Sequence, residues 1–325
     1  MDLFAIILCG GNGSRLWPLS TSNKPKQFTA INNNLTLLEN TINRIPKNFR
    51  KVFITNANYQ NMIDNYISTN DIVLFEPCRK NTGPAILAAL QIIKKINCDA
   101  KILVVPSDHI FDDTLFKSLV EKGLDIIDND KVITWGIKPT YAETDYGYIK
   151  RTGNSIEFIE KPNKDLATAM FNSGEYLWNS GVFMFSAETL SKIAINLCGD
   201  ILKCINLTNK DNKYFLDESF KTCIDIPFDK LVMERITNGH VIEFSGLWTD
   251  IGDWRRLYDA FPKDENNNVI IGDKNVKTLG ATDSLFLTNN ANIICIDVDD
   301  LVVVQYNNNI LISKMKSSSK IKALI

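Results

Sequence analysis

The segment LFAIILCGGNGSRLWPLSTSNKPKQF, residues 3–28, decides the fold of this 325-residue chain. The continuous apolar run at residues 3–8 predicts a strand that is buried on both faces of a sheet. Three glycines follow it, and glycines let backbone N–H groups approach an anion closely. Because Arg15 can donate a two-pronged hydrogen bond and Lys24 and Lys26 add positive charge, the segment favours a loop that binds phosphate.

Two standard phosphate-binding motifs do not fit this loop. The dinucleotide motif G-x-G-x-x-G would need a third glycine where Leu16 stands, and no acidic residue follows at the distance that holds a ribose. The ATPase motif G-x-x-x-x-G-K-[ST] fails when counted from any glycine of the loop. A glycine-rich turn with solvated basic residues is the structural alternative.

The composition excludes several classes of protein. A content of 45% hydrophobic and 23% charged residues is ordinary for a soluble globular protein, and the net charge of −2 provides no global field for nucleic acid or an anionic membrane. Seven scattered cysteines favour reduced thiols, and two histidines exclude a histidine-rich metal site. The N-terminus lacks a secretory signal and a membrane span, so we expect a cytoplasmic protein.

Strand-like and helix-like segments alternate in the first half of the chain. This alternation predicts an α/β protein with a Rossmann-like, open, mixed and mostly parallel sheet that is covered on both faces. We expect the strands at residues 3–8, 51–55, 71–76, 101–108 and 131–137, and the helices at residues 83–96 and 114–127.

The middle and the end of the chain follow other patterns. Residues 146–162 predict an antiparallel hairpin, and residues 176–186 a second strand pair or one bent strand. After a helix at 253–261 the composition becomes polar and rich in asparagine, and only short strand-like runs remain. We therefore predict one domain at 1–262 and a small C-terminal β domain at 263–325, built as a β-helix or a meander.

The segments GGNGSRLWPLS and KPKQF resemble the signature of the sugar nucleotidyltransferases, and within this family that of the mannose-1-phosphate guanylyltransferases. The resemblance covers about residues 3–260 and implies the nucleotide-diphospho-sugar transferase fold. It implies that the loop holds a nucleoside triphosphate, and Ser14 stands where the family usually has threonine. The nucleotide-binding residues implied in this way are Leu8, Gly10, Gly11, Gly13, Ser14, Arg15, Lys26, Asn81, Thr82 and Gly83.

The segment EPCRKNTGPAI, residues 76–86, resembles the part of the family that lines the guanine pocket. The residues alone indicate a strand end, a polar loop and a helix that begins near Pro84, so helix capping is the structural alternative. Lys80 stands where the family usually has arginine, and Gly83 where it has alanine.

Two aspartates are candidate metal ligands. Asp108 follows a predicted strand, where open α/β sheets bind ligands, although a single aspartate there often caps a helix. The resemblance implies that Asp108 and Asp250, the latter within LWTDIGDW, share one Mg²⁺, a cation that prefers carboxylate and phosphate oxygens. Asp253 is expected to cap the following helix, and His109 to have a structural role.

The predicted hairpin and the strand after it carry candidates for sugar binding. Gly147, Glu160, Lys161 and Asn179 are weak signals one by one, but together they resemble the sugar-1-phosphate site of the family. The resemblance implies that Glu160 binds sugar hydroxyls and that Lys161 holds the phosphate. The segment PFDKLVMER, residues 227–235, is expected to form a helix that lines the site.

The resemblance implies the transfer of GMP from GTP to mannose 1-phosphate, which gives GDP-mannose and diphosphate by direct in-line attack. Its expected catalytic residues are Arg15, Lys26, Asp108 and Lys161, and its cofactor is Mg²⁺. The alternatives are a related enzyme of the GDP-heptose or dTDP-glucose type and a catalytically inactive nucleotide-binding regulator. A Rossmann oxidoreductase is disfavoured because the third glycine is missing.

We expect GTP and mannose 1-phosphate as partners, no nucleic acid and no membrane, and a homodimer as the candidate assembly. Longer relatives carry a sugar-phosphate isomerase domain after this region. Residues 263–325 are too short for such a domain, so we expect no isomerase activity.

Overall fold

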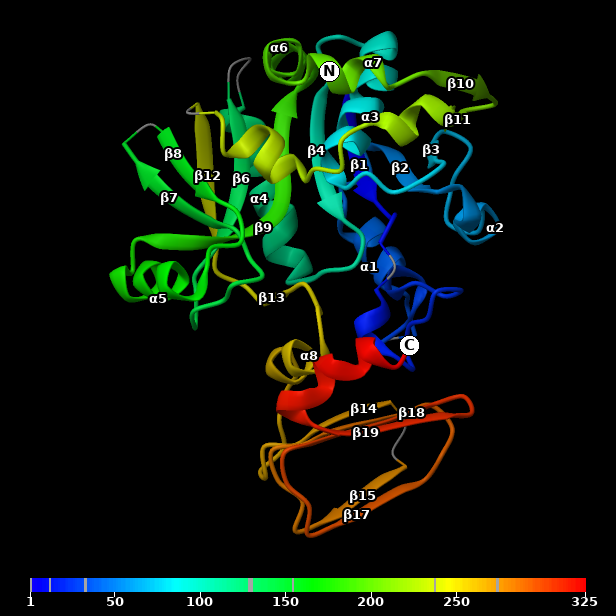
Figure 1. Ribbon diagram of the computed structural model, residues 1–325, viewed down its shortest axis with the longest axis vertical. Coiled ribbons are helices and arrows are strands. Elements are labelled where there is room, and N and C mark those ends of the chain that lie inside the picture. Colours follow the sequence, from blue (N-terminus) through cyan, green and yellow to red (C-terminus); the bar gives the residue numbers. More distant parts are fainter. Residues whose placement is uncertain are drawn as a thin grey trace. The chain divides into compact units, whose positions relative to one another are not determined.

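The computed structural model describes residues 2–11, 13–31, 34–127, 131–153, 155–236, 238–272 and 275–325, without the side chains of Ser14 and Lys322. The chain forms two compact units, each assembled from separate stretches of sequence (Figure 1). Unit 1 holds residues 1–10, 43–106 and 112–246, and unit 2 holds residues 11–42, 107–111 and 247–325. The predicted domain boundary between residues 262 and 263 stays a prediction.

A mixed sheet forms the centre of unit 1, and its strand order is β10-β11-β3-β2-β1-β4-β9-β6-β12. The strands β3, β2, β1 and β4 are parallel neighbours, whereas β9 pairs antiparallel with both β4 and β6. The predicted α/β class is confirmed. The strands are β1 (Leu3–Leu8), β2 (Arg50–Asn56), β3 (Ile72–Glu76), β4 (Lys101–Pro106), β6 (Val132–Ile137), β9 (Tyr176–Ser186), β10 (Leu207–Lys210), β11 (Lys213–Leu216) and β12 (Gly239–Phe244).

Helices cover both faces of this sheet, as its alternating side chains require. Phe183 and Phe185 of β9 join the large apolar core beneath α3 and α6. Met184, between them, points to the opposite face, where a Cβ on Gly123 of α4 would lie 3.1 Å from its sulfur. The helices of the chain up to α7 are α1 (Leu37–Arg44), α2 (Gln60–Ile63), α3 (Thr82–Ile96), α4 (Asp113–Ile126), α5 (Lys164–Ser173), α6 (Ala187–Leu197) and α7 (Gly199–Lys203).

An antiparallel hairpin extends the sheet, as the sequence predicted. Strand β7 (Tyr148–Thr152) pairs with β8 (Ser155–Ile159) on one side and with β9 on the other. Residues 176–186 form one continuous strand whose pairing with β6 shifts register between Thr134 and Gly136, so the bent-strand alternative is correct.

Parallel coils make up most of the C-terminal part of unit 2. Val269, Leu285 and Val302 stack in register on β14, β16 and β18, and β15 and β17 pair in the same parallel way. This pairing supports the β-helix interpretation, because a meander would be antiparallel throughout. The strands are β14 (Val269–Gly272), β15 (Val276–Leu279), β16 (Leu285–Thr288), β17 (Ile293–Ile296), β18 (Leu301–Tyr306) and the antiparallel β19 (Asn309–Lys314).

The coils share one apolar core with the glycine-rich loop. Leu16 and Leu19 of the loop and Ile251 are buried in the same cluster as Leu285 and Val302. Helix α8 (Trp254–Ala260) and the helical turns η6 (Met315–Ala323) belong to this cluster as well. The N-terminal loop is therefore part of the same compact body as the C-terminal strands.

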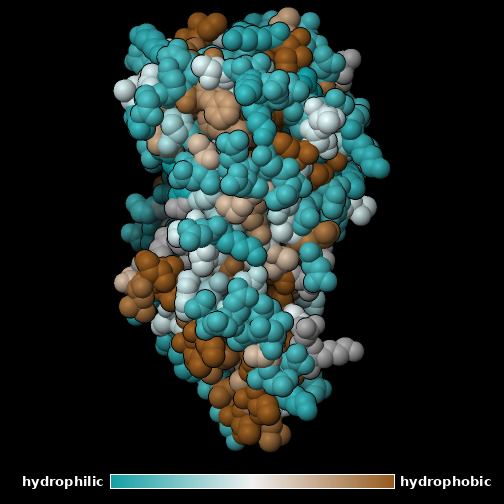
Figure 2. Space-filling view, turned by 90° about the vertical axis from the view of Figure 1, so that its right-hand side faces the viewer, coloured by the Kyte–Doolittle hydropathy of each residue, from teal (hydrophilic) through white to brown (hydrophobic). Residues whose placement is uncertain are grey.

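The outer side of the coils is apolar in places. Leu279, Ile294 and Ile296 of β15 and β17 are 57–69% exposed. Figure 2 shows apolar side chains gathered in the lower part of the view. Within the described residues, no helix has the length and the apolar character needed to cross a membrane.

Candidate active site

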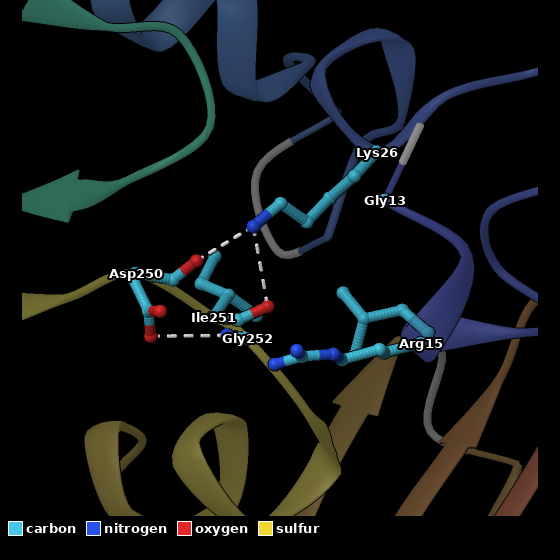
Figure 3. A pocket seen from close by; sticks show the side chains of 7 residues that line it. Gly13, Arg15, Lys26, Asp250, Ile251 and Gly252 are labelled. Carbon is cyan, nitrogen blue, oxygen red and sulfur yellow. Dashed lines mark hydrogen bonds between the residues drawn. The ribbon is translucent and has the colours of Figure 1, made fainter. Parts of the chain in front are cut away.

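A pocket of about 280 Å³ in unit 2 gathers several of the predicted residues (Figure 3). The loop after β1, the turn after β13 and the start of helix η2 (Lys26–Phe28) all contribute to it. The residues that line it are Gly13, Arg15, Leu16, Lys26, Asp250, Ile251 and Gly252.

Lys26 is buried in this pocket and is held by several polar contacts. It is 6% exposed, and its Nζ donates to the backbone carbonyl oxygens of Asp250 at 2.6 Å and Ile251 at 3.3 Å. The same nitrogen lies 3.0 Å from Oδ2 of Asp108. A side chain at Gly13, whose φ is +58°, would overlap Lys26. Gly13 is therefore needed both for its backbone conformation and for the room that it leaves to Lys26.

A short strand pair explains why Asp108 and Asp250 come together. Strand β5 (Ile110–Phe111) pairs antiparallel with β13 (Trp248–Thr249), so Asp108 shortly precedes one strand and Asp250 directly follows the other. His109 stacks its ring edge-on against Trp248 at 5.8 Å between ring centres. This contact agrees with the structural role expected for His109.

The groups around Asp108 shift its pKa in opposite directions. Burial raises the pKa of Asp108, but the positive charges of Lys26 and His109 outweigh burial and hold this pKa below its ordinary value. The negative charge of Asp250 acts in the raising direction. Asp250 forms its own ion pair at 2.8 Å with Nη1 of Arg256. Asp108 is thus held in its ionised form, and Asp250 is paired with a cation.

The donor set fits a magnesium ion that also binds substrate. Mg²⁺ is typically held by one or two carboxylates, while phosphate oxygens and waters complete its shell. Asp108 and Asp250 supply two carboxylates, and no group of three or more His, Cys, Asp or Glu side chains suited to a metal occurs among the described residues. Their role as metal ligands stays a prediction.

The rest of the loop is arranged around the pocket. Arg15 extends into it from η1 (Ser14–Leu16) (Figure 3), and a Cβ on Gly11 would meet no atom within 4 Å. The predicted contact of the Ser14 side chain lies outside the described residues. Lys24 points elsewhere, because its Nζ lies 3.3 Å from the hydroxyl of Tyr306.

The predicted nucleotide residues of unit 1 separate into two groups. Leu8 ends β1, and Gly10 lies so close to β3 that a Cβ would be 3.2 Å from Oε2 of Glu76. Thr82 and Gly83 instead contact residues 226–228, because Thr82 Oγ1 accepts from the N–H of Phe228 and the Gly83 N–H donates to Ile226.

Asn81 is both a cap and a strained residue. Its side chain accepts a hydrogen bond from the N–H of Thr82 at 3.0 Å, and helix α3 begins at Thr82, close to the predicted start. Its φ is +64° and its ψ is −172°, a conformation that residues other than glycine rarely adopt. The capping alternative therefore describes this contact, and binding of a base by Asn81 stays a prediction.

Glu76 was missed by sequence reasoning. It ends β3, is 4% exposed, and its Oε1 accepts no hydrogen bond from the described residues. Burial raises the pKa of Glu76 to about 8, and the charge of Arg79 offsets only part of this rise. A buried carboxyl oxygen without a hydrogen bond is costly and often marks a functional site. The available signal was an acidic residue at the end of an otherwise apolar strand.

The predicted sugar residues lie together in unit 1. The Asn179 N–H donates to the carbonyl oxygen of Gly147 at 2.8 Å, and a Cβ on Gly147 would be 2.7 Å from Oε2 of Glu160. Lys161 Nζ lies 3.1 Å from Oε1 of Glu160. The side chain of Glu160 is 7% exposed, whereas that of Lys161 is 57% exposed and able to reach a ligand.

Asp229 joins this group from a short segment of π-type helix, Asp229–Met233, within the helix predicted at 227–235. Asn179 Nδ2 donates to Asp229 Oδ1 at 2.6 Å, and Glu234 accepts from the N–H of Glu160 at 2.9 Å. Burial and the charge of Glu160 raise the pKa of Asp229 to about 7, while Lys161 and Asn179 act in the lowering direction. The arrangement offers hydrogen-bond donors and acceptors of the kind that bind sugar hydroxyls.

Comparisons with known proteins agree with this geometry. The chain is 34% identical to the mannose-1-phosphate guanylyltransferase RfbM of Salmonella typhimurium, over 100% of this chain and 72% of the relative. It is 32% identical to the mannose-1-phosphate guanylyltransferase of Escherichia coli K12, over 99% of this chain and 73% of the relative. A crystal structure titled mannose-1-phosphate geranyltransferase, from Thermus thermophilus, matches with a TM-score of 0.90 and 26% identity over 100% and 98% of the two chains.

The family model named Nucleotidyl transferase matches residues 4–267. This match covers the glycine-rich loop, Asp108, the sugar-binding candidates and Asp250. The resemblance found in the sequence is thereby confirmed at the level of the family and of the fold. This chain belongs to the nucleotidyl transferase family and is a sugar-1-phosphate nucleotidyltransferase.

Proposed function

We propose that the enzyme transfers GMP from GTP to mannose 1-phosphate and releases diphosphate. The relatives at 30–34% identity are named for this reaction, which supports both the nucleotide and the sugar. The observation that carries the proposal is the pocket of unit 2, where Arg15, Lys26 and Asp250 occur together and Lys26 Nζ also lies 3.0 Å from the carboxylate of Asp108.

For this reaction the protein mainly has to position the two substrates and to neutralise the negative charge of their phosphates. Mannose 1-phosphate is already an anionic nucleophile, so no general base is required for its attack on the α-phosphorus of GTP. Arg15 and Lys26 would stabilise the negative charge of the departing diphosphate, and Lys161 would hold the sugar phosphate. Mg²⁺ on Asp108 and Asp250, when bound, would neutralise phosphate oxygens and help to orient them.

Glu76 supports guanine as the base. Guanine presents two neighbouring N–H donors, at N1 and at the 2-amino group, and a carboxylate can accept both. Glu76 ends a parallel strand, at the sheet edge where α/β proteins bind nucleotides, and its Oε1 still lacks a hydrogen bond within the described residues. Accepting two hydrogen bonds would favour the ionised carboxylate and would offset the cost of its burial.

The pair of Asp229 and Glu160 supports a polyhydroxylated second substrate. Asp229 changes its protonation state near neutral pH, because burial and the charge of Glu160 raise its pKa to about 7. A protonated carboxyl donates to a hydroxyl oxygen while an ionised one accepts from a hydroxyl hydrogen. Gly147 leaves room for the carboxylate of Glu160, and Asn179 donates a hydrogen bond to Asp229.

The test is a panel of diphosphate-release assays. GTP, ATP and dTTP are each combined with mannose 1-phosphate and with glucose 1-phosphate in the presence of Mg²⁺. We expect turnover to be fastest with GTP and mannose 1-phosphate. Faster turnover with dTTP and glucose 1-phosphate would support the dTDP-glucose alternative. If the protein binds GTP but turns over none of the substrate pairs, the inactive regulator would be supported.

A further inference from the structure

Ile251 adopts a backbone conformation that is unfavourable for its side chain. Its φ is +45°, in the left-handed region, which a β-branched residue adopts only under constraint. The side chain is nevertheless fully buried, in the apolar core that also contains Trp254 and Leu16. Such strain persists where the surrounding structure determines it, and it clusters at functional sites.

Contacts on both sides hold this conformation. The N–H of Ile251 donates to Oγ1 of Thr249 at 3.1 Å, and its carbonyl oxygen accepts from Lys26 Nζ at 3.3 Å. Lys26 also donates to the preceding carbonyl oxygen, of Asp250, at 2.6 Å (Figure 3). The peptide groups around Ile251 are thus fixed by one buried cation and one hydroxyl.

The same turn determines the direction of the Asp250 carboxylate. Its Oδ1 accepts from the N–H of Gly252 at 3.0 Å, and its Oδ2 accepts from Nη1 of Arg256 at 2.8 Å. A Cβ on Gly252 would be 2.9 Å from Oδ2 of Asp250 and would overlap Arg256. The carboxylate therefore depends on the backbone of the next two residues, and Ile251 is the residue whose side chain ties that backbone to the core.

We propose that Ile251 is a positioning residue, which anchors a strained turn so that Asp250 faces Asp108 and can bind a divalent cation. Glycine would tolerate the left-handed conformation without strain, but it would not tie the turn to the core. The isoleucine accordingly strains the local backbone, but its buried side chain fixes the position of the Asp250 carboxylate. This inference rests on the proposed function, because it assumes that Asp108 and Asp250 bind a metal ion.

The experiment measures Mn²⁺ binding to the full chain without substrates, by water proton relaxation or by the electron paramagnetic resonance signal of free Mn²⁺. Ile251→Gly is expected to weaken Mn²⁺ binding at least ~10-fold, since metal sites typically lose ~10–100-fold when groups that orient their ligands are removed. Ile251→Val retains the branched, buried side chain and should bind Mn²⁺ within about threefold of the wild type. kcat should fall with Mn²⁺ affinity in Ile251→Gly, while the KM for mannose 1-phosphate changes little.

Thr249→Val is a second perturbation of the same turn. It removes the acceptor for the Ile251 N–H, keeps the size of the side chain, and should weaken Mn²⁺ binding in the same direction. Asp211→Gly is the matched control, because Asp211 is exposed and also has a left-handed φ, of +53°, in the turn between β10 and β11. It should leave Mn²⁺ binding unchanged.

The outcomes separate the inference from the proposed function. If Asp250→Asn weakens Mn²⁺ binding but Ile251→Gly and Thr249→Val bind Mn²⁺ as the wild type does, even with lower melting temperatures, Ile251 has only a packing role. If Asp250→Asn itself leaves Mn²⁺ binding unchanged, the metal site of the proposed function is wrong, and the inference with it.

Discussion

Asp229→Asn tests the raised pKa of Asp229. Burial and the charge of Glu160 raise the pKa of Asp229 from 3.8 to about 7. In the unfolded chain Asp229 ionises near its ordinary pKa, so the folded protein loses stability as the pH rises from about 4 to about 7. Asparagine has the shape of the protonated acid and can still accept the hydrogen bond from Asn179.

The magnitude follows from the size of this shift. One pKa unit corresponds to ~1.4 kcal/mol, so the rise to about 7 gives an upper limit of ~4 kcal/mol for the cost of ionising Asp229 in the folded state. Partial exposure to solvent and relaxation of the site reduce this cost, and we expect ~1–3 kcal/mol. Asp229→Asn should therefore stabilise the ligand-free protein above about pH 7 by this amount relative to its effect near pH 4.

The assay is chemical denaturation of wild type and variant at several values between about pH 4 and about pH 8. The difference in free energy of unfolding should grow with pH up to about 7 and then level off. Taking the difference between the two proteins cancels the contribution of Glu76, whose raised pKa has the same direction of effect. A difference that does not change with pH, or that shrinks as the pH rises, would refute the raised pKa of Asp229.

The other predictions concern the two substrates and the metal. Asp108→Asn should lower kcat by at least ~100-fold in diphosphate release, because Lys26 loses its ionised partner and the metal loses a ligand; near-wild-type turnover would contradict the metal assignment. Glu76→Gln should reduce the preference for GTP over inosine triphosphate, which lacks the 2-amino group, by ~10-fold or more in kcat/KM, and an unchanged preference would show that Glu76 does not contact the base. Gly147→Ala would place a Cβ 2.7 Å from Oε2 of Glu160. It should raise the KM for mannose 1-phosphate ~10-fold and leave that for GTP unchanged, since it displaces a hydroxyl-binding group. A raised KM for GTP with an unchanged KM for mannose 1-phosphate would show that the sugar binds elsewhere.

The sequence predicted those parts of the fold that depend on local patterns. The apolar run of β1 and the three-and-four spacing of α3 each define an element without knowledge of its neighbours. The hairpin of β7 and β8 follows from a short turn between two alternating segments, for the same reason. The coils of the C-terminal strands could be suspected only from the regular spacing of their turns.

The parts that the sequence missed depend on contacts between distant residues. Glu76 becomes exceptional only because folding buries it and leaves one oxygen without a hydrogen bond from the described residues. Lys26 was expected only to bind phosphate, yet it also donates hydrogen bonds to the backbone carbonyls of Asp250 and Ile251, which lie more than two hundred residues away in the sequence. The positive φ of Ile251 has no signal in the sequence, because isoleucine is among the residues least suited to that conformation.

The most direct test of the proposed reaction is to identify its products. Wild-type protein is incubated with GTP, mannose 1-phosphate and Mg²⁺, and the mixture is followed by ³¹P nuclear magnetic resonance, with Asp108→Asn as the control. We predict that GDP-mannose and diphosphate appear in equal amounts as GTP and mannose 1-phosphate disappear, and that the variant forms them far more slowly. Unchanged GTP and mannose 1-phosphate with folded wild-type protein, or inorganic phosphate as the only product, would contradict guanylyl transfer.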